Sequence, residues 1–92
     1  MQDHAAVEAE RVIEAACKHY RIEEDELLEK KYGDKRRATD AWRIWTETSV
    51  VHQWLADRMR LSSRANASNM VRLFEASRER DLTKEVRKWK NL

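Results

Sequence analysis

The chain has 92 residues, of which 39% are charged, with no proline and one glycine. This length suits one domain, and the scarcity of helix breakers beside many Glu, Lys, Arg, Leu and Ala residues favours helices. No apolar run approaches the roughly eighteen residues of a membrane span, no apolar leader opens the chain, and one cysteine cannot form an internal disulfide. We therefore expect a cytoplasmic protein that forms one compact all-α domain of five or six helices.

The net charge of +2 conceals an uneven distribution along the chain. Residues 1–34 carry 10 acidic and 5 basic side chains, whereas residues 35–92 carry 7 acidic and 14 basic ones. A surface with excess positive charge attracts polyanions such as nucleic acids. The second part of the chain is thus the candidate for such a surface, although charged helices also have plain solvated faces.

Apolar residues recur every three or four positions, which is the period of an amphipathic helix. The first repeat predicts a helix over residues 4–20. Its buried face comprises Ala9, Val12, Ile13, Ala16, Cys17 and Tyr20. Cys17 is interpreted as a small core residue rather than a nucleophile. A short second helix is expected over residues 23–31, ended by Gly33 as the residue after its C-cap.

A basic connector, residues 34–37, precedes a third predicted helix over residues 38–48. A last helix is expected over residues 80–90. Three tryptophans fall on the apolar stripes of these helices and are expected in the core, namely Trp42, Trp45 and Trp89. Trp54 lies at the flank of its stripe and is expected to be half-exposed.

The segment WLADRMRLSSRANASNMVRLF, residues 54–74, joins two further predicted helices across a polar break. The fourth helix is expected over residues 49–60, capped by Thr48 or Ser49. The fifth is expected over residues 63–77, capped by Ser62 or Ser63, because a hydroxyl there accepts a hydrogen bond from a free backbone N–H. The inward side chains of the pair are Leu55, Ala56, Met59, Leu61, Ala67, Met70, Val71 and Phe74.

Two helices around a short turn form a helix-turn-helix, whose second helix reads the major groove of DNA. Small residues on the outward face of the fifth helix allow close approach, and Asn and Arg side chains can hydrogen-bond to base edges. The expected base-facing residues are Ala65, Asn66, Ser68, Asn69 and Arg72. The expected phosphate-facing residues are Lys35, Arg36, Arg37, Ser62, Ser63 and Arg64.

LADRMRLSSRANA, residues 55–67, resembles without gaps the helix-turn-helix in the DNA-binding domain of the bacterial replication initiator DnaA, a Trp-repressor-like domain. The turn is about one residue longer than in the commonest pattern, as in that family. The family's first two helices resemble the segment VIEAACKHYRIEEDELLEK. Its basic loop, its middle helix and the start of its helix-turn-helix resemble the segment GDKRRATDAWRIWTETSVVHQWLADRM. WLADRMRLSS is closer still to the related domain attached to REP-associated tyrosine transposases.

The resemblance implies a bacterial, nucleoid-associated protein whose partner is double-stranded DNA, with a role in transposition or replication. The sequence departs from the initiator where base specificity is carried, because Ser62, Ser63, Arg64, Ala65 and Asn66 replace the run R-D-H-T-T. Arg60 also stands where a turn glycine is common. The initiator's own DNA target is therefore not implied.

We expect this chain to contain neither the ATPase domain of the initiator nor the catalytic domain of the transposase. There is no Gly-rich phosphate loop, and His4, His19 and His52 are too far apart for the transposase's His-hydrophobic-His motif. The same spacing does not match the ligand spacing of a zinc site, and no metal or cofactor is expected. The chain would be the DNA-binding part alone, as a fragment or a stand-alone protein. The alternative is a helical protein-interaction module, or a homodimer, that uses the acidic N-terminal helix or Trp54.

Overall fold

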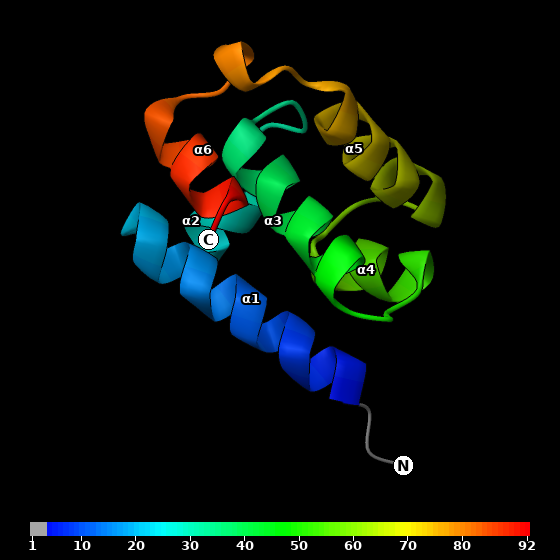
Figure 1. Cartoon of the computed structure of the whole chain (residues 1–92). Coiled ribbons are helices and arrows are strands. Elements are labelled where there is room, and N and C mark those ends of the chain that lie inside the picture. The colour runs from blue at the N-terminus through cyan, green and yellow to red at the C-terminus, as the bar shows by residue number, and fades with distance from the viewer. Residues whose placement is uncertain (1–3) are drawn as a thin grey trace.

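The central element of the fold is the helix α3, which spans Lys35–Glu47 in a computed structural model that describes residues 4–92 (Figure 1). Two helices pack on it from one side, α1 (His4–Tyr20) and α6 (Lys84–Lys90), and α5 (Arg64–Ala76) packs on it from the other (Figure 1). The remaining elements are α2 (Glu24–Leu28), α4 (His52–Arg58) and the 3-10 turn η1 (Glu79–Asp81). The described part of the chain is thus all-helical, as the sequence predicts.

One apolar cluster fills the space around α3 and draws on every α-helix. Because α3 is covered on several sides, even polar residues in its middle are buried, and Thr39 and Asp40 are fully so. Trp89 is buried in this core as predicted. Trp42 and Trp45 are only partly buried against it, and so is Trp54. None of the helices in the described part is long and apolar enough to cross a membrane.

The first helix has the predicted bounds, whereas the later ones are shorter or begin elsewhere. The predicted connector over residues 34–37 is wrong, because the carboxylate of Asp34 accepts a hydrogen bond from the Arg36 N–H at 2.9 Å and caps α3. Three of the four connector residues therefore form the first turn of α3. The predicted role of Gly33 is also wrong, since α2 ends at Leu28 and the backbone of Gly33 has no positive φ.

The predicted cap of the fourth helix is wrong for a related reason. The hydroxyl of Thr48 donates to the carbonyl of Ile44 at 2.7 Å, so Thr48 ends α3 and does not begin α4. The N-cap of α4 is Val51, which offers no side-chain hydrogen bond. By contrast, one of the two predicted caps of α5 is confirmed, since the hydroxyl of Ser63, and not that of Ser62, accepts a hydrogen bond from the Asn66 backbone N–H at 3.2 Å.

The helices α1 and α4 end in the same backbone motif. Arg21 and Arg60 follow them with a φ of 59°, in the left-handed region. The next N–H then reaches back five residues, from Ile22 to Cys17 at 3.1 Å and from Leu61 to Ala56 at 2.8 Å. This is the Schellman arrangement, in which glycine is the usual left-handed residue. Arg60 thus adopts the conformation expected of the missing turn glycine.

Candidate nucleic-acid interface

The helices α4 and α5 pack on each other around the turn formed by residues 59–63. Leu61 is buried beneath this turn, at 8% exposure. Every side chain predicted to face inward is buried, which confirms the predicted set: Leu55, Ala56, Met59, Leu61, Ala67, Met70, Val71 and Phe74. The opposite face of α5 is consequently turned away from the core.

The outward face of α5 combines small and polar side chains. Ala65 and Arg72 are exposed, and Ser68 and Asn69 are half-buried. The guanidinium of Arg72 donates to the side-chain oxygen of Asn69 at 2.6 Å. This bond orients the Asn69 amide and leaves its NH₂ group free to donate outward.

Asn66 is tied to the protein more closely than the sequence indicates. Its side-chain amide donates to the hydroxyl of Ser62, and its backbone carbonyl accepts a hydrogen bond from the Tyr32 hydroxyl at 2.7 Å. The side chain of Tyr32 therefore joins the loop between α2 and α3 to the first half of α5. Lys31, the neighbour of Tyr32, is exposed and was not among the predicted site residues.

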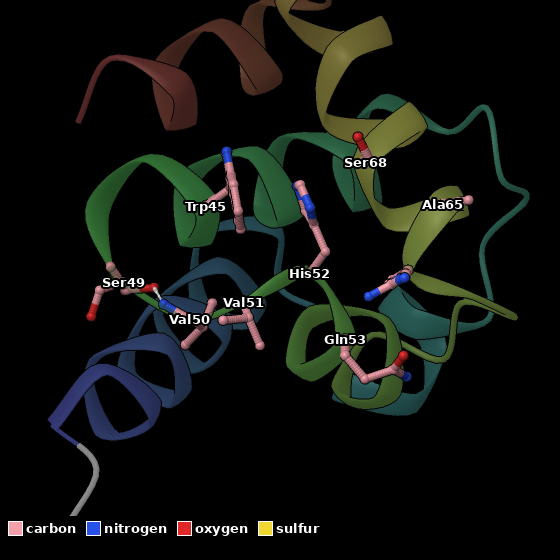
Figure 2. Close-up of a pocket in the computed structure, with 10 residues that line it drawn as sticks. Trp45, Ser49, Val50, Val51, His52, Gln53, Ala65 and Ser68 are labelled. Carbon is pink, nitrogen blue, oxygen red and sulfur yellow. Dashed lines mark hydrogen bonds between the residues drawn. The ribbon is translucent and has the colours of Figure 1, made fainter.

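A groove of about 910 Å³ opens beside the N-terminal end of α5 (Figure 2). Arg64, Ala65 and Ser68 line it from α5, and His52 and Gln53 line it from the start of α4. The rings of Trp45 and His52 stack with their centroids 3.8 Å apart, at an interplanar angle of 13°. This stack forms one wall of the groove (Figure 2).

Sequence reasoning missed His52 and Gln53 as lining residues. The sequence predicts that the fourth helix starts at residue 49, so His52 and Gln53 were not expected at its N-terminal end. They are in fact its first two residues. The groove is chemically mixed: it offers an imidazole, an amide, a guanidinium and a hydroxyl for hydrogen bonding, next to an aromatic surface.

Arg37 is the clearest correction among the predicted phosphate-facing residues. Its side chain is buried, and its guanidinium donates to the carbonyl oxygens of Lys30, Met59 and Arg60 at 2.8, 2.9 and 3.0 Å. Burial lowers the pKa of Arg37 from its ordinary value. The side chain therefore joins the loop before α3 to the turn before α5, and it does not face a phosphate.

The other two cations of this run are partly engaged within the chain. Arg36 forms an ion pair with Asp34 at 3.1 Å. The ammonium of Lys35 donates to the hydroxyl of Ser77, just beyond the C-terminal end of α5, at 3.0 Å. Lys35 and Arg64 therefore mark opposite ends of α5. Ser62 and Ser63, whose hydroxyl groups are predicted to contact phosphates, are both exposed. Each hydroxyl also accepts a hydrogen bond from Asn66.

The acidic residues of the N-terminal part are largely neutralised inside the chain. Among residues 4–34, every acidic side chain except Glu23 forms an ion pair. The guanidinium of Arg58 binds Glu10 at 2.6 Å and Glu24 at 2.8 Å. Its hydrogen bonds lower the pKa of Glu24, against the opposing effect of burial.

Several cations have no such partner. The exposed basic residues whose side chains form no ion pair or hydrogen bond within residues 4–92 are Arg21, Lys31, Arg64, Arg78, Arg80, Lys84 and Lys88. Two of them, Lys31 and Arg64, come from the segments that meet at the first half of α5. The acidic half of the sequence therefore does not cancel the positive charge beside this helix.

No protein-family model, curated protein or solved structure matches this chain.

Proposed function

We propose that the chain is a sequence-reading, double-stranded DNA-binding module in which α5 enters the major groove. The observation that carries this proposal is the outward face of α5. Small and amide side chains lie there between Arg64 and Arg72, and neither arginine has an acidic partner within residues 4–92. A major groove admits one helix, and an exposed polar face is what such a helix presents to base edges.

The proposed contacts divide into two classes. Ala65, Ser68, Asn69 and Arg72 would face the bases, since an Asn amide matches adenine and an Arg guanidinium matches guanine. Asn66 would act chiefly through its position, because its amide already bonds Ser62. The base-reading amide of this face is therefore Asn69.

Phosphate contacts supply most of the affinity of such modules. Arg64 and Lys31 would contact phosphates near the N-terminal end of α5, and Lys35 near its C-terminal end. His52 and Gln53 extend this set, because they share the groove of Arg64. Ser62 and Ser63, exposed at the turn, would approach the same strand.

The resemblance of residues 55–67 to the helix-turn-helix of the replication initiator and of the transposase-associated domain supports the same proposal. It adds a Trp-repressor-like ancestry and a role in transposition or replication in a bacterial cell. The one-residue-longer turn carries this resemblance, and the left-handed backbone of Arg60 and the buried Leu61 accommodate that turn.

The test begins with selection of bound duplexes from a random pool, followed by fluorescence anisotropy with the selected sequence at several salt concentrations. Arg64→Ala should weaken all duplexes alike and reduce the salt slope by about 0.9, the value for one phosphate contact. Asn69→Ala should instead reduce the preference for the selected sequence, by about 1–3 kcal/mol. Arg11→Ala is the matched control, since Arg11 is paired with Glu8 on α1.

Absent binding, or binding that salt does not weaken, would contradict the proposal. The alternative, a protein-interaction module or homodimer, predicts a different result. A sedimentation mass that shows a stable dimer, unchanged by duplex DNA, would favour that alternative.

A further inference from the structure

A second basic surface lies where the end of α1 meets α6, on the side of α3 away from α5 (Figure 1). A shallow groove of about 450 Å³ is present there. His19 and Arg21 line it from the end of α1, and Lys84, Glu85 and Lys88 line it from α6. Three cations thus share one groove with a single acidic residue.

The cations of this groove are not used to stabilise the fold. Arg21, Lys84 and Lys88 are exposed, and none forms an ion pair within residues 4–92. Lys84 and Lys88 are four residues apart on one helix, where like charges repel each other. A bound anion would relieve this repulsion.

The floor of the groove is firmly built. The Nε2 atom of His19 lies 2.8 Å from the carbonyl oxygen of Glu85, which joins the end of α1 to α6. The His19 ring also packs against Tyr20 and Trp89, with ring centroids 4.9 and 5.5 Å apart. The backbones that carry the three cations are therefore held in a fixed relation.

We propose that this groove binds the phosphodiester backbone of a second nucleic-acid segment, so that one copy of the chain holds two duplexes. Lysine and arginine side chains that share one groove and have no acidic partner can bind the phosphates of a nucleic-acid backbone. The identity of the ligand rests on the proposed DNA binding by α5. A membrane surface fits less well, because membrane-binding helices expose apolar residues, whereas Val86 and Trp89 of α6 are buried.

A capture experiment tests this inference. One duplex of the selected sequence is immobilised, the full chain is bound to it, and the capture of a second, fluorescent duplex is measured. The double variant Lys84→Ala, Lys88→Ala should stay on the immobilised duplex within about twofold of the unchanged chain. Its capture of the second duplex should fall about tenfold or more, since two phosphate contacts are lost.

The matched control is Arg78→Ala, Arg80→Ala, which removes two exposed, unpaired cations outside the groove and should leave capture unchanged. The inference is overturned if the Lys84→Ala, Lys88→Ala variant captures the second duplex as well as the unchanged chain does. It is also overturned if the unchanged chain binds one duplex and captures no second one.

If α5 does not bind DNA, the proposed function fails, and this experiment gives a different result. In that case the variant Arg64→Ala, Arg72→Ala would retain the immobilised duplex as tightly as the unchanged chain. Binding to vesicles of phosphatidylserine and phosphatidylcholine distinguishes a lipid ligand from a nucleic acid. Vesicle binding that requires Lys84 and Lys88, without capture of a second duplex, overturns the inference in favour of lipid headgroups.

Discussion

Asp40 is an acidic residue that the fold removes completely from water. It is fully buried in the middle of α3, and neither carboxylate oxygen has a hydrogen-bond partner within the described residues. Burial raises the pKa of Asp40 well above its ordinary value, although Arg43 and Arg58 act in the opposite direction. A buried carboxyl without partners favours its neutral, protonated form.

This environment makes stability depend on pH. Asp40 binds its proton more tightly in the folded chain than in the unfolded one. Its contribution to stability is therefore complete below the unfolded pKa of about 3.9 and is lost as pH rises toward the folded pKa. Asp40→Asn should raise the free energy of unfolding at pH 7, because the amide carries no charge that burial penalises.

Urea unfolding at pH 4 and pH 7 measures this effect. The gain from Asp40→Asn should shrink toward pH 4, whereas Asp81→Asn, at an exposed acid, should have little effect at either pH. An equal gain at both values would show that the carboxyl is not titrating in the folded chain.

The left-handed residues Arg21 and Arg60 are the second residue-scale feature. A side chain in this conformation costs roughly 1–2 kcal/mol, which glycine avoids. Arg21→Gly should therefore stabilise the fold by about 1 kcal/mol. Arg60→Gly should gain less, because it also removes ion pairs with Asp25 and Glu29, each worth up to about 1 kcal/mol.

Chemical unfolding of both variants compares the two effects. Arg21→Ala serves as the control, since alanine keeps the Cβ atom that causes the strain and should bring no comparable gain. A stabilisation by alanine equal to that by glycine would mean that charge, and not backbone conformation, is the cause.

At the scale of elements, the N-terminal end of α5 serves both folding and the proposed DNA contact. Ser63 satisfies the free N–H of Asn66 there. Ser63→Ala should lower the free energy of unfolding by about 1 kcal/mol, the usual value of an N-cap. Ser63→Asn and Ser63→Asp should both retain the cap, because each offers an acceptor oxygen.

Only the aspartate adds a negative charge beside the expected phosphates. Ser63→Asp should therefore keep its stability and bind duplex DNA more weakly than Ser63→Asn does, when both are compared by anisotropy at equal salt. Equal binding by the two variants would place the DNA away from this end of α5.

At the scale of the whole molecule, Arg37 connects segments that are far apart in the sequence. Its guanidinium satisfies three carbonyl groups, one before α3 and two in the turn before α5. Arg37→Ala should destabilise the fold by about 3 kcal/mol, since one buried and two partly buried carbonyl groups lose charged hydrogen bonds. Arg37→Lys should recover only part of this loss, because an ammonium lacks the planar fork.

Arg36→Ala removes the same charge from the same helical turn and is the control. The side chain of Arg36 donates hydrogen bonds only to Asp34 among the described residues, so its loss should cost less than about 1 kcal/mol in thermal or urea unfolding. An equal loss of unfolding free energy in Arg36→Ala and Arg37→Ala would show that Arg37 does not stabilise the fold more than Arg36 does.

The distribution of charge is also a property of the whole molecule. Arg58 and Arg60 come from the basic half of the sequence, yet they neutralise acids of α1, of α2 and of the segment after α2. Of the exposed cations that remain unpaired within residues 4–92, Lys31 and Arg64 lie beside α5, and Arg21, Lys84 and Lys88 line the groove between α1 and α6. Counting charges along the chain shows the excess but not these two locations.

The sequence by itself determined the features that depend on neighbours in the chain. The apolar period of three and four fixed the all-α fold, the bounds of α1 and the inward residues of α4 and α5. The Ser63 cap was also predictable, because a cap needs only a hydroxyl three residues before a free N–H.

Only the tertiary structure decided which polar side chains are used inside the molecule. Arg36 and Arg37 are adjacent and chemically identical, yet Arg36 is half-buried and pairs with Asp34, whereas Arg37 is buried and bonds the carbonyl groups of Lys30, Met59 and Arg60. Thr48 ends one helix instead of starting the next, and Asp40 is buried because helices cover α3 on several sides. The physical reason is that burial and pairing depend on which segments lie side by side, and a periodic pattern of apolar residues does not specify this.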